Sequence, residues 1–165
     1  MINCSVPLYS FRFLPTVGAL STGMTKNDPQ EGIMIKNINI KTRTRNEFVD
    51  ITAEIQSLID EAGIKSGICH VYVPHTTAGV TVNEGADPSV MKDIQNTLTR
   101  LVPHNGTYFH TEGNSDAHIK TSIVGSSQAI IIDGGKLLLG TWQSVFFCEF
   151  DGPRHRRITV KIAAD

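Results

Sequence analysis

Hydrophobic and polar residues alternate in the first patterned segment of the chain. In IMIKNINIKT, which starts at Ile33, the side chains of Ile38, Ile40 and Thr42 fall on one side of an extended chain. The polar residues Asn39 and Lys41 fall on the other side. Alternation with a period of two is typical of a strand with one buried face. The pattern therefore predicts a strand over residues 33–42.

The period changes in the next segment, TRNEFVDITAEIQSLIDEAG. Its apolar residues recur at intervals of three and four and form one stripe: Phe48, Ile51, Ile55, Leu58 and Ile59. Thr44 with Glu47 fits a capping box, and Gly63 fits a left-handed helix stop. The segment thus predicts a helix that begins near Thr44 and ends at Gly63.

Two further strands and a second helix follow. GICHVYVP and TAGVTVN are rich in strand-forming residues and are separated by Pro74. ADPSVMKDIQNTLTRLVP returns to helical spacing, with Asp87 as the N-cap, Pro88 at the first helical position and Pro103 after the end. These segments predict strands near residues 67–74 and 77–83 and a helix near 87–102.

The remaining chain combines a polar loop with strands. HNGTYFHTEGNSDAH, residues 104–118, has few periodic apolar residues and predicts a loop. SQAIIIDGGKLLLG predicts two strands joined by a Gly-Gly hairpin, and SVFFCEF and RRITVKIAA predict two more, joined through DGPR. Together these elements predict an α+β fold, a β-sandwich of about seven strands with two main helices.

Residues 1–31 differ in composition from residues 32–165. They contain scattered Ser, Thr, Gly and Pro and no acidic residue before Asp28. We interpret residues 1–31 as a disordered leader or extension and residues 32–165 as a single domain. Pro7, Arg12 and Pro15 interrupt every apolar run that a secretory signal would need. Organellar import through residues 1–31 stays open.

Charge and cysteine content limit the partners of the chain. Fifteen Lys and Arg against sixteen Asp and Glu give a net charge of -1, which argues against binding to nucleic acid. No apolar run approaches the roughly 20 residues of a membrane span. Three cysteines without close pairing indicate a reducing compartment. We therefore expect a cytoplasmic protein without nucleic-acid or membrane partners.

Three of the six histidines stand in polar, glycine-bearing segments: His75, His110 and His118. Imidazole is a common metal ligand, so these three residues are candidate ligands of a divalent metal, Mg²⁺ or Zn²⁺. Glu84 and Asp116 are carboxylates within reach of the same segments. The spacing matches no standard zinc motif, and each histidine could instead be a hydrogen-bonded structural residue. His70 and His104 are interpreted as structural.

Anion-binding features accompany the histidines. Thr76 and Thr77 belong to a turn of small residues whose backbone N–H groups could approach an anion. The basic cluster of residues 154–157 is usually a solvated edge, but it could receive phosphate. Gln143, next to the only Trp, could orient a substrate or a metal-bound water. Lys120 and Arg154 are the expected positive partners of a phosphorylated substrate.

Three segments together resemble one known family. HTTAGVTVNEGADP, EGNSDAHIKTSIVGSS and GTWQSVFFCEFDGPRHRRI, in this order and spacing, are similar to the YjbQ-like secondary thiamine-phosphate synthase family. The likeness covers about residues 33–163. It implies a β-sandwich with two helices that assembles as a homotrimer, with sites near subunit boundaries. It also implies a primary or secondary activity that joins an aminopyrimidine methyl diphosphate to a thiazole phosphate and releases pyrophosphate.

The resemblance assigns roles to the polar residues already named. It implies catalytic roles for His75, Glu84, Asp116 and Gln143, and metal binding by His75, His110 and His118. Substrate binding is assigned to Asn83 and Asn114 by the resemblance, and to Thr76, Thr77, Lys120 and Arg154 by the anion-binding features described above. Two alternatives remain: a trimeric module that binds a metal or small ligand without catalysis, and a metal-assisted hydrolase with Glu84 as general base. A small phosphorylated molecule is the expected partner of the site.

Overall fold

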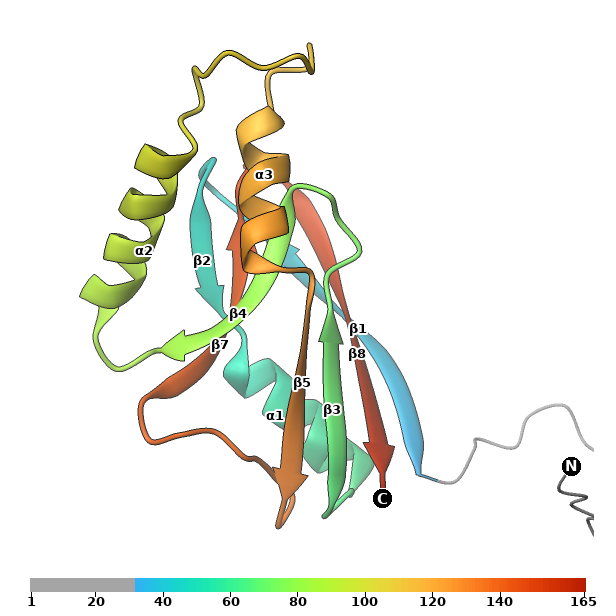
Figure 1. Ribbon diagram of the computed structural model, residues 1–165. Coiled ribbons are helices and arrows are strands. Elements are labelled where there is room, and N and C mark those ends of the chain that lie inside the picture. The colour runs from blue at the N-terminus through green and yellow to red at the C-terminus, as the bar shows by residue number, and fades with distance from the viewer. Residues whose placement is uncertain (1–31) are drawn as a thin grey trace, which may run out of the picture.

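A computed structural model describes residues 32–165 and confirms the α+β class. Within these residues the chain forms eight strands in two sheets and three helices, one strand and one helix more than predicted (Figure 1). The two sheets curl around a shared hydrophobic core that includes the first helix, and the other two helices lie on the outer side of the smaller sheet. The predicted extension, residues 1–31, lies outside the described residues.

The larger sheet has five antiparallel strands in the order β1-β8-β3-β5-β6. Their bounds are β1 (Ile33–Lys41), β8 (His155–Ala164), β3 (Gly67–Tyr72), β5 (Ser127–Asp133) and β6 (Lys136–Leu137). The predicted alternation in β1 is confirmed: Ile40 is buried and Lys41 is exposed. Gly134 and Gly135 form the predicted hairpin between β5 and β6, both with positive φ.

The smaller sheet has three strands in the order β2-β7-β4: β2 (Glu47–Asp50), β7 (Gln143–Glu149) and β4 (Ala78–Glu84). Its central strand, β7, is buried on both faces. Val145 and Phe147 point into the core shared with the larger sheet, and Phe146 and Cys148 point into a second core under the helices. Alternate positions of one strand thus serve two cores.

Helix α1 (Thr52–Ala62) buries Ile55 and Ile59 in the larger core. The predicted start at Thr44 is wrong, because residues 47–50 form β2 instead. Glu47 does accept hydrogen bonds from the backbone N–H groups of Arg43 and Thr44, but these close a turn rather than a helix. The predicted stop is confirmed: Gly63 ends α1 with φ 66°.

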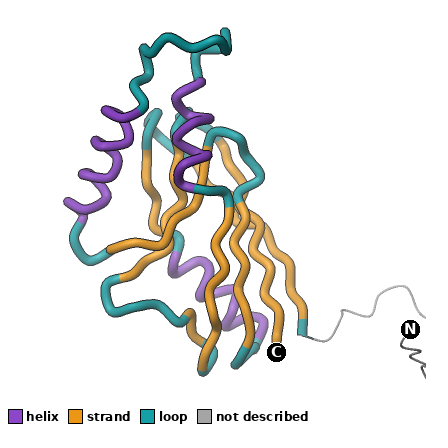
Figure 2. Tube along the Cα trace, in the orientation of Figure 1, coloured by secondary structure: helices purple, strands orange, loops and turns teal. Residues whose placement is uncertain are grey.

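Helices α2 (Pro88–Leu101) and α3 (Ser115–Val124) cover the smaller sheet (Figure 2). The Asp87 side chain accepts a hydrogen bond from Ser89 N–H at the start of α2, as predicted. Helix α3 was missed, because part of the predicted loop 104–118 is helical. Its buried face carries polar residues, among them Asp116, Lys120 and Thr121, so no apolar stripe marks it in the sequence. Between residues 32 and 165, no helix is long and apolar enough to cross a membrane.

Candidate functional site

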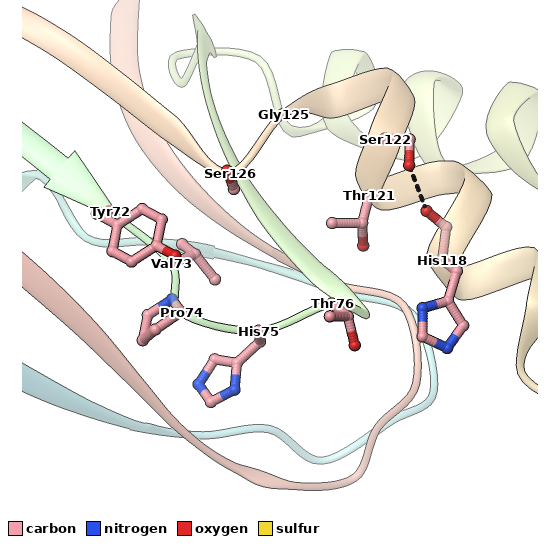
Figure 3. A pocket seen from close by; sticks show the side chains of 10 residues that line it. All are labelled: Tyr72, Val73, Pro74, His75, Thr76, His118, Thr121, Ser122, Gly125 and Ser126. Atoms are coloured by element: carbon pink, nitrogen blue, oxygen red, sulfur yellow. Dashed lines mark hydrogen bonds between the residues drawn. The ribbon is translucent and has the colours of Figure 1, made fainter.

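The loop of residues 73–77, between β3 and β4, faces the second half of α3 across a cavity of about 610 Å³. Tyr72, His75 and Thr76 line one side, and His118, Thr121 and Ser122 line the other (Figure 3). The backbone at Gly79 approaches the chain after α3 closely, since a Cβ there would lie 2.5 Å from the carbonyl oxygen of Gly125. Glycine at this position therefore allows β4 to lie this close to the end of α3 beside the cavity.

His75 is held in one orientation by the neighbouring strand. Its Nε2 accepts a 3.0 Å hydrogen bond from the backbone N–H of Arg157 in β8. Burial and the nearby Arg156 charge lower the pKa of His75 below its usual value, which favours the neutral ring. A neutral imidazole that accepts through Nε2 carries its proton on Nδ1. His75 therefore presents an N–H donor at Nδ1.

A second cavity, of about 520 Å³, adjoins the first and shares His75 with it. Its other walls come from β1 and β8 and include Lys41, His155 and Arg157. Within residues 32–165, neither Lys41 nor Arg157 has an acidic partner within salt-bridge distance, and both are exposed. We call this the cationic cavity, and the first one the hydroxyl cavity.

Arg156 differs from its neighbours because its side chain points inward. Its guanidinium group makes hydrogen bonds of 2.6 and 2.7 Å to the two carboxylate oxygens of Glu149, which is fully buried. The same guanidinium donates to the hydroxyl of Thr77. Glu149 neutralises the Arg156 charge, and the pair fixes the end of the 73–77 loop. The hydroxyl of Thr77, which was predicted to bind substrate, thus accepts a hydrogen bond from within the chain.

Hydroxyl groups give the first cavity its polar character. Thr121 is 8% exposed, and its Oγ1 has no hydrogen-bond partner in the described part of the chain. Ser122 donates to the backbone carbonyl of His118 (Figure 3). Leaving a buried hydroxyl without a partner costs about 1–3 kcal/mol. A ligand oxygen in the cavity would satisfy Thr121.

Asp116 and Lys120 form a buried ion pair inside α3, with both side chains 1% exposed and 2.8 Å between Nζ and Oδ2. Although burial by itself would raise it, the hydrogen bonds from Lys120, Arg45 and His104 lower the pKa of Asp116 to about 2. Asp116 therefore stays ionised near neutral pH, so it cannot donate a proton there, and with this pKa it is only a weak base. The catalytic role of Asp116 and the contact of Lys120 with substrate stay predictions, but each of the two side chains is already paired with the other inside α3.

Arg45 and His104 were missed as members of this cluster. Arg45 Nη2 lies 2.9 Å from Asp116 Oδ1, and His104 Nδ1 lies 3.3 Å from the same atom. Arg45 is 71 positions from Asp116 in the sequence, and His104 is 12 positions from it and outside α3, so helical spacing reveals neither contact. The interpretation of His104 as structural fits its contact with the cluster.

Asn114 and Arg154 meet at the corner between β7 and β8. Asn114 Nδ2 lies 3.3 Å from Asp151 Oδ2, and Arg154 Nη2 lies 2.7 Å from the same oxygen. Asn114 and Arg154, which were predicted to contact substrate, are thus both hydrogen-bonded to Asp151. Neither residue lines the hydroxyl or the cationic cavity.

Asn83, Glu84 and Gln143 lie at the opposite end of β4 from Thr77. Glu84 pairs with Gln143 in the sheet, whereas Ala78 pairs with Glu149. At about 3.3 Å per residue, Ala78 and Glu84 are about 20 Å apart along the strand. Gln143 accepts a hydrogen bond from Gly140 N–H, and Asn83 accepts one from Glu84 N–H. The structure therefore separates these three residues from the predicted histidine site within one chain.

Comparison with known proteins identifies the family. The family profile described as "UPF0047 protein YjbQ-like" matches residues 36–165. A UPF0047 protein of Methanocaldococcus jannaschii is 60% identical over 132 residues, which cover 80% of this chain and 96% of the relative. The chain belongs to the UPF0047 YjbQ-like family.

Two solved structures of YjbQ-like proteins share the fold. One, from Clostridium acetobutylicum, is described as an uncharacterized conserved protein; it is 52% identical, has a TM-score of 0.76, and covers 77% of this chain and 98% of its own. Another, from Sulfolobus solfataricus, is described as a protein of unknown function. It is 33% identical, has a TM-score of 0.78, and covers 81% of this chain and 98% of its own.

The family resemblance is thereby confirmed, but the thiamine-phosphate synthase activity inferred from it is wrong. These YjbQ-like relatives are named only as uncharacterized proteins or as proteins of unknown function, and none of their names carries that activity. The likeness of the motifs supports a shared fold, and it does not define a reaction.

The three histidines of this YjbQ-like chain do not form one metal-ligand set in the described structure. His110 and His118 stack edge to face, with ring centroids 5.3 Å apart. The Nε2 lone pair of His75 is occupied by Arg157 N–H, and its Nδ1 carries the proton. No cluster of three or more His, Cys, Asp or Glu side chains that could hold a metal occurs in residues 32–165. Metal binding by His75, His110 and His118 stays a prediction, and in this orientation it would require His75 to release its contact with Arg157.

Proposed function

We propose that this chain binds a small phosphorylated molecule at the two cavities that meet at His75, without metal coordination by His75. The observation that carries the proposal is the position of His75, whose ring stands between the hydroxyl cavity and the cationic cavity. An anion there would meet positive charge on one side and hydrogen-bond donors on the other.

The positive charge comes from exposed side chains that have no counter-ion in the described residues. Lys41 and Arg157 line the cationic cavity, whereas Arg156 is neutralised by Glu149. A guanidinium group matches the geometry of phosphate oxygens and can bind two of them at once. Arg157 is therefore the expected main contact of a phosphate group.

The hydrogen-bond donors come from the hydroxyl cavity and from the wall between the cavities. His75 offers Nδ1–H, and Thr76 and Thr121 offer hydroxyl groups. The buried Oγ1 of Thr121 would gain the partner that it lacks among residues 32–165. A phosphate oxygen or an ester oxygen provides such a partner.

The position of Glu84 disfavours the alternative of a hydrolase with Glu84 as general base. Glu84 lies at the far end of β4, about 20 Å along the strand from Ala78. A general base must reach the proton that it abstracts directly or through one water. Non-covalent binding is therefore the function that this single-chain geometry supports best.

We further infer that the chain assembles as a homotrimer. Four strands of the larger sheet carry a row of apolar side chains on the outer face, because the strand register places Ile33, Ala163, Ile68 and Ile131 side by side. A separate exposed set, Leu101, Phe109 and Ile123, belongs to the segment from α2 to α3. Two different patches that contact each other on neighbouring subunits generate a closed ring rather than a twofold dimer. A ring of three subunits is the one that the family resemblance implies.

A nuclear magnetic resonance titration with inorganic phosphate tests the binding site. We expect the largest shifts of backbone amide signals at residues 75–76, 121–122 and 155–157, which come from three separate segments. Shifts spread evenly over the exposed lysines and arginines, or no saturable shift at all, would contradict the proposed site.

A further inference from the structure

A third cavity, of about 380 Å³, continues the binding surface beyond the hydroxyl cavity. It lies between the loop that follows α2 and the first half of α3, and His118 lines both it and the hydroxyl cavity. The three cavities therefore form a series: the cationic cavity, His75, the hydroxyl cavity, His118 and the third cavity.

The walls of the third cavity are mainly apolar. Tyr108, Phe109 and Ile119 line it, together with the two stacked imidazoles of His110 and His118. The Tyr108 hydroxyl donates a 2.6 Å hydrogen bond to the carbonyl of Pro103, so the polar end of this side chain is already used. Its ring also lies against Gly106, where an added Cβ would come within 2.7 Å of it. These contacts fix the Tyr108 ring as a preformed wall.

Ser115 supplies one polar atom inside this apolar lining. The residue is 8% exposed, and its Oγ is buried with no hydrogen-bond partner elsewhere in residues 32–165. A buried hydroxyl without a partner costs stability, as at Thr121. The occupant that would satisfy Ser115 is an apolar group that carries a hydrogen-bonding atom.

We propose that the third cavity binds the organic part of the same phosphorylated ligand, which makes that ligand a phosphate ester of a mainly apolar alcohol. This inference rests on the proposed function, because the phosphate group occupies the cavities at His75. The phosphate then binds beside Arg157, and the organic group extends past His118 toward Ile119 and Ser115.

Calorimetric titrations with methyl, butyl and benzyl phosphate test this inference. Burial of the larger groups should make butyl and benzyl phosphate bind about tenfold or more tightly than methyl phosphate. The substitution Ile119→Asn should abolish this preference and leave the affinity for methyl phosphate unchanged. Ile35→Asn is the matched control, because Ile35 on β1 is exposed and is neither among the residues that line the third cavity nor in the apolar sets assigned to the trimer contact.

The outcomes separate this inference from the proposed function. Equal affinities for the three esters, or a preference that survives Ile119→Asn, would overturn the third cavity as part of the site. In that case methyl phosphate would still bind and would still depend on Arg157. Absence of binding by all three esters and by inorganic phosphate would instead overturn the proposed function itself. A preference for benzyl over butyl phosphate would support the inference and identify the organic group as a planar ring.

Discussion

The backbone N–H of Arg157 donates a 3.0 Å hydrogen bond to Nε2 of His75, across 82 positions of sequence. This contact determines which nitrogen of His75 carries the proton, and so whether the residue acts as a donor, a base or a metal ligand. The ring becomes a neutral donor at Nδ1, which suits recognition of an oxygen atom.

The tautomer of His75 can be measured directly. At pH 7 we expect nitrogen chemical shifts of a protonated Nδ1 and an unprotonated Nε2 for His75. A protonated Nε2, or a rapidly exchanging mixture of tautomers, would contradict the assigned role.

Two substitutions separate the donor at Nδ1 from the acceptor at Nε2. His75→Asn can place an amide N–H near the position of Nδ1, whereas His75→Gln can place a carbonyl oxygen near Nε2 and keep the contact to Arg157 N–H. We expect phosphate affinity within about threefold of the parent for His75→Asn and a loss of about tenfold for His75→Gln. The opposite order would show that the contact to Arg157, and not the donor, supports binding.

The lowered pKa of His75 also affects stability at low pH. Burial and the Arg156 charge disfavour the protonated ring in the folded state, whereas the unfolded chain titrates near the ordinary value of 6.5. Below that pH the unfolded state binds a proton at His75 and the folded state does not, so the His75 contribution to the free energy of unfolding falls. Between pH 7 and pH 5, His75→Gln should therefore lose less stability than the parent in urea unfolding. Parallel losses would contradict this effect.

The Asp116–Lys120 pair should be strongly coupled in stability. Asp116→Asn leaves the buried ammonium group of Lys120 without its carboxylate, and we expect a cost of about 3–5 kcal/mol. Adding Lys120→Met should restore part of that loss, because the unpaired charge is removed. Urea unfolding of the two single variants and the double variant measures the coupling. Additive losses would show that the two residues are independent.

The Asp116–Lys120 pair also predicts the pH range over which its contribution to stability is lost. The pKa of Asp116 is about 2 in the folded chain, below the ordinary value of 3.8, so its stabilising effect is complete above pH 4 and is lost as pH falls toward 2. The stability gap between the parent and Asp116→Asn should therefore narrow over that range. A gap that stays constant from pH 5 to pH 2 would contradict the depressed pKa.

The proposed trimer has a simple test in solution. Light scattering at micromolar concentration should give about 54 kDa, three times the 18.0 kDa of one chain. Ile68→Asp places a charge in the middle of the apolar row and should shift the mass toward the monomer, whereas Thr159→Asp, at a half-buried position of the same sheet outside the row, is the control. A parent protein of 18 kDa would contradict the trimer.

The fold was predictable where local patterns decide the structure. The alternation around Ile38 and Ile40, the cap at Asp87 and the stop at Gly63 each act within a few residues. Strand β2 was missed because Phe48 and Ile51 also fit helical spacing. In the fold, Phe48 instead packs edge to face on Phe150, with ring centroids 6.0 Å apart, a contact that the local sequence does not encode.

The candidate site was predictable in part. His75, Thr76 and His118 do lie around one cavity, and Arg157 of the basic cluster lines the adjoining cationic cavity. Helix α3 was missed because its buried residues are polar, and one of them, Asp116, has a long-range partner in Arg45. The prediction placed residues from the two ends of β4 in one site because they are close in the sequence. In the structure the length of the strand separates them.

Phosphate binding by the parent protein and two charge variants tests the central claim most directly. Arg157 and Lys161 are exposed on the same face of β8, but only Arg157 is among the residues that line the cationic cavity. Calorimetry should show saturable binding of inorganic phosphate that weakens about tenfold in Arg157→Ala and changes less than about twofold in Lys161→Ala. Equal losses in both variants, or no saturable binding by the parent, would contradict an anion site at His75.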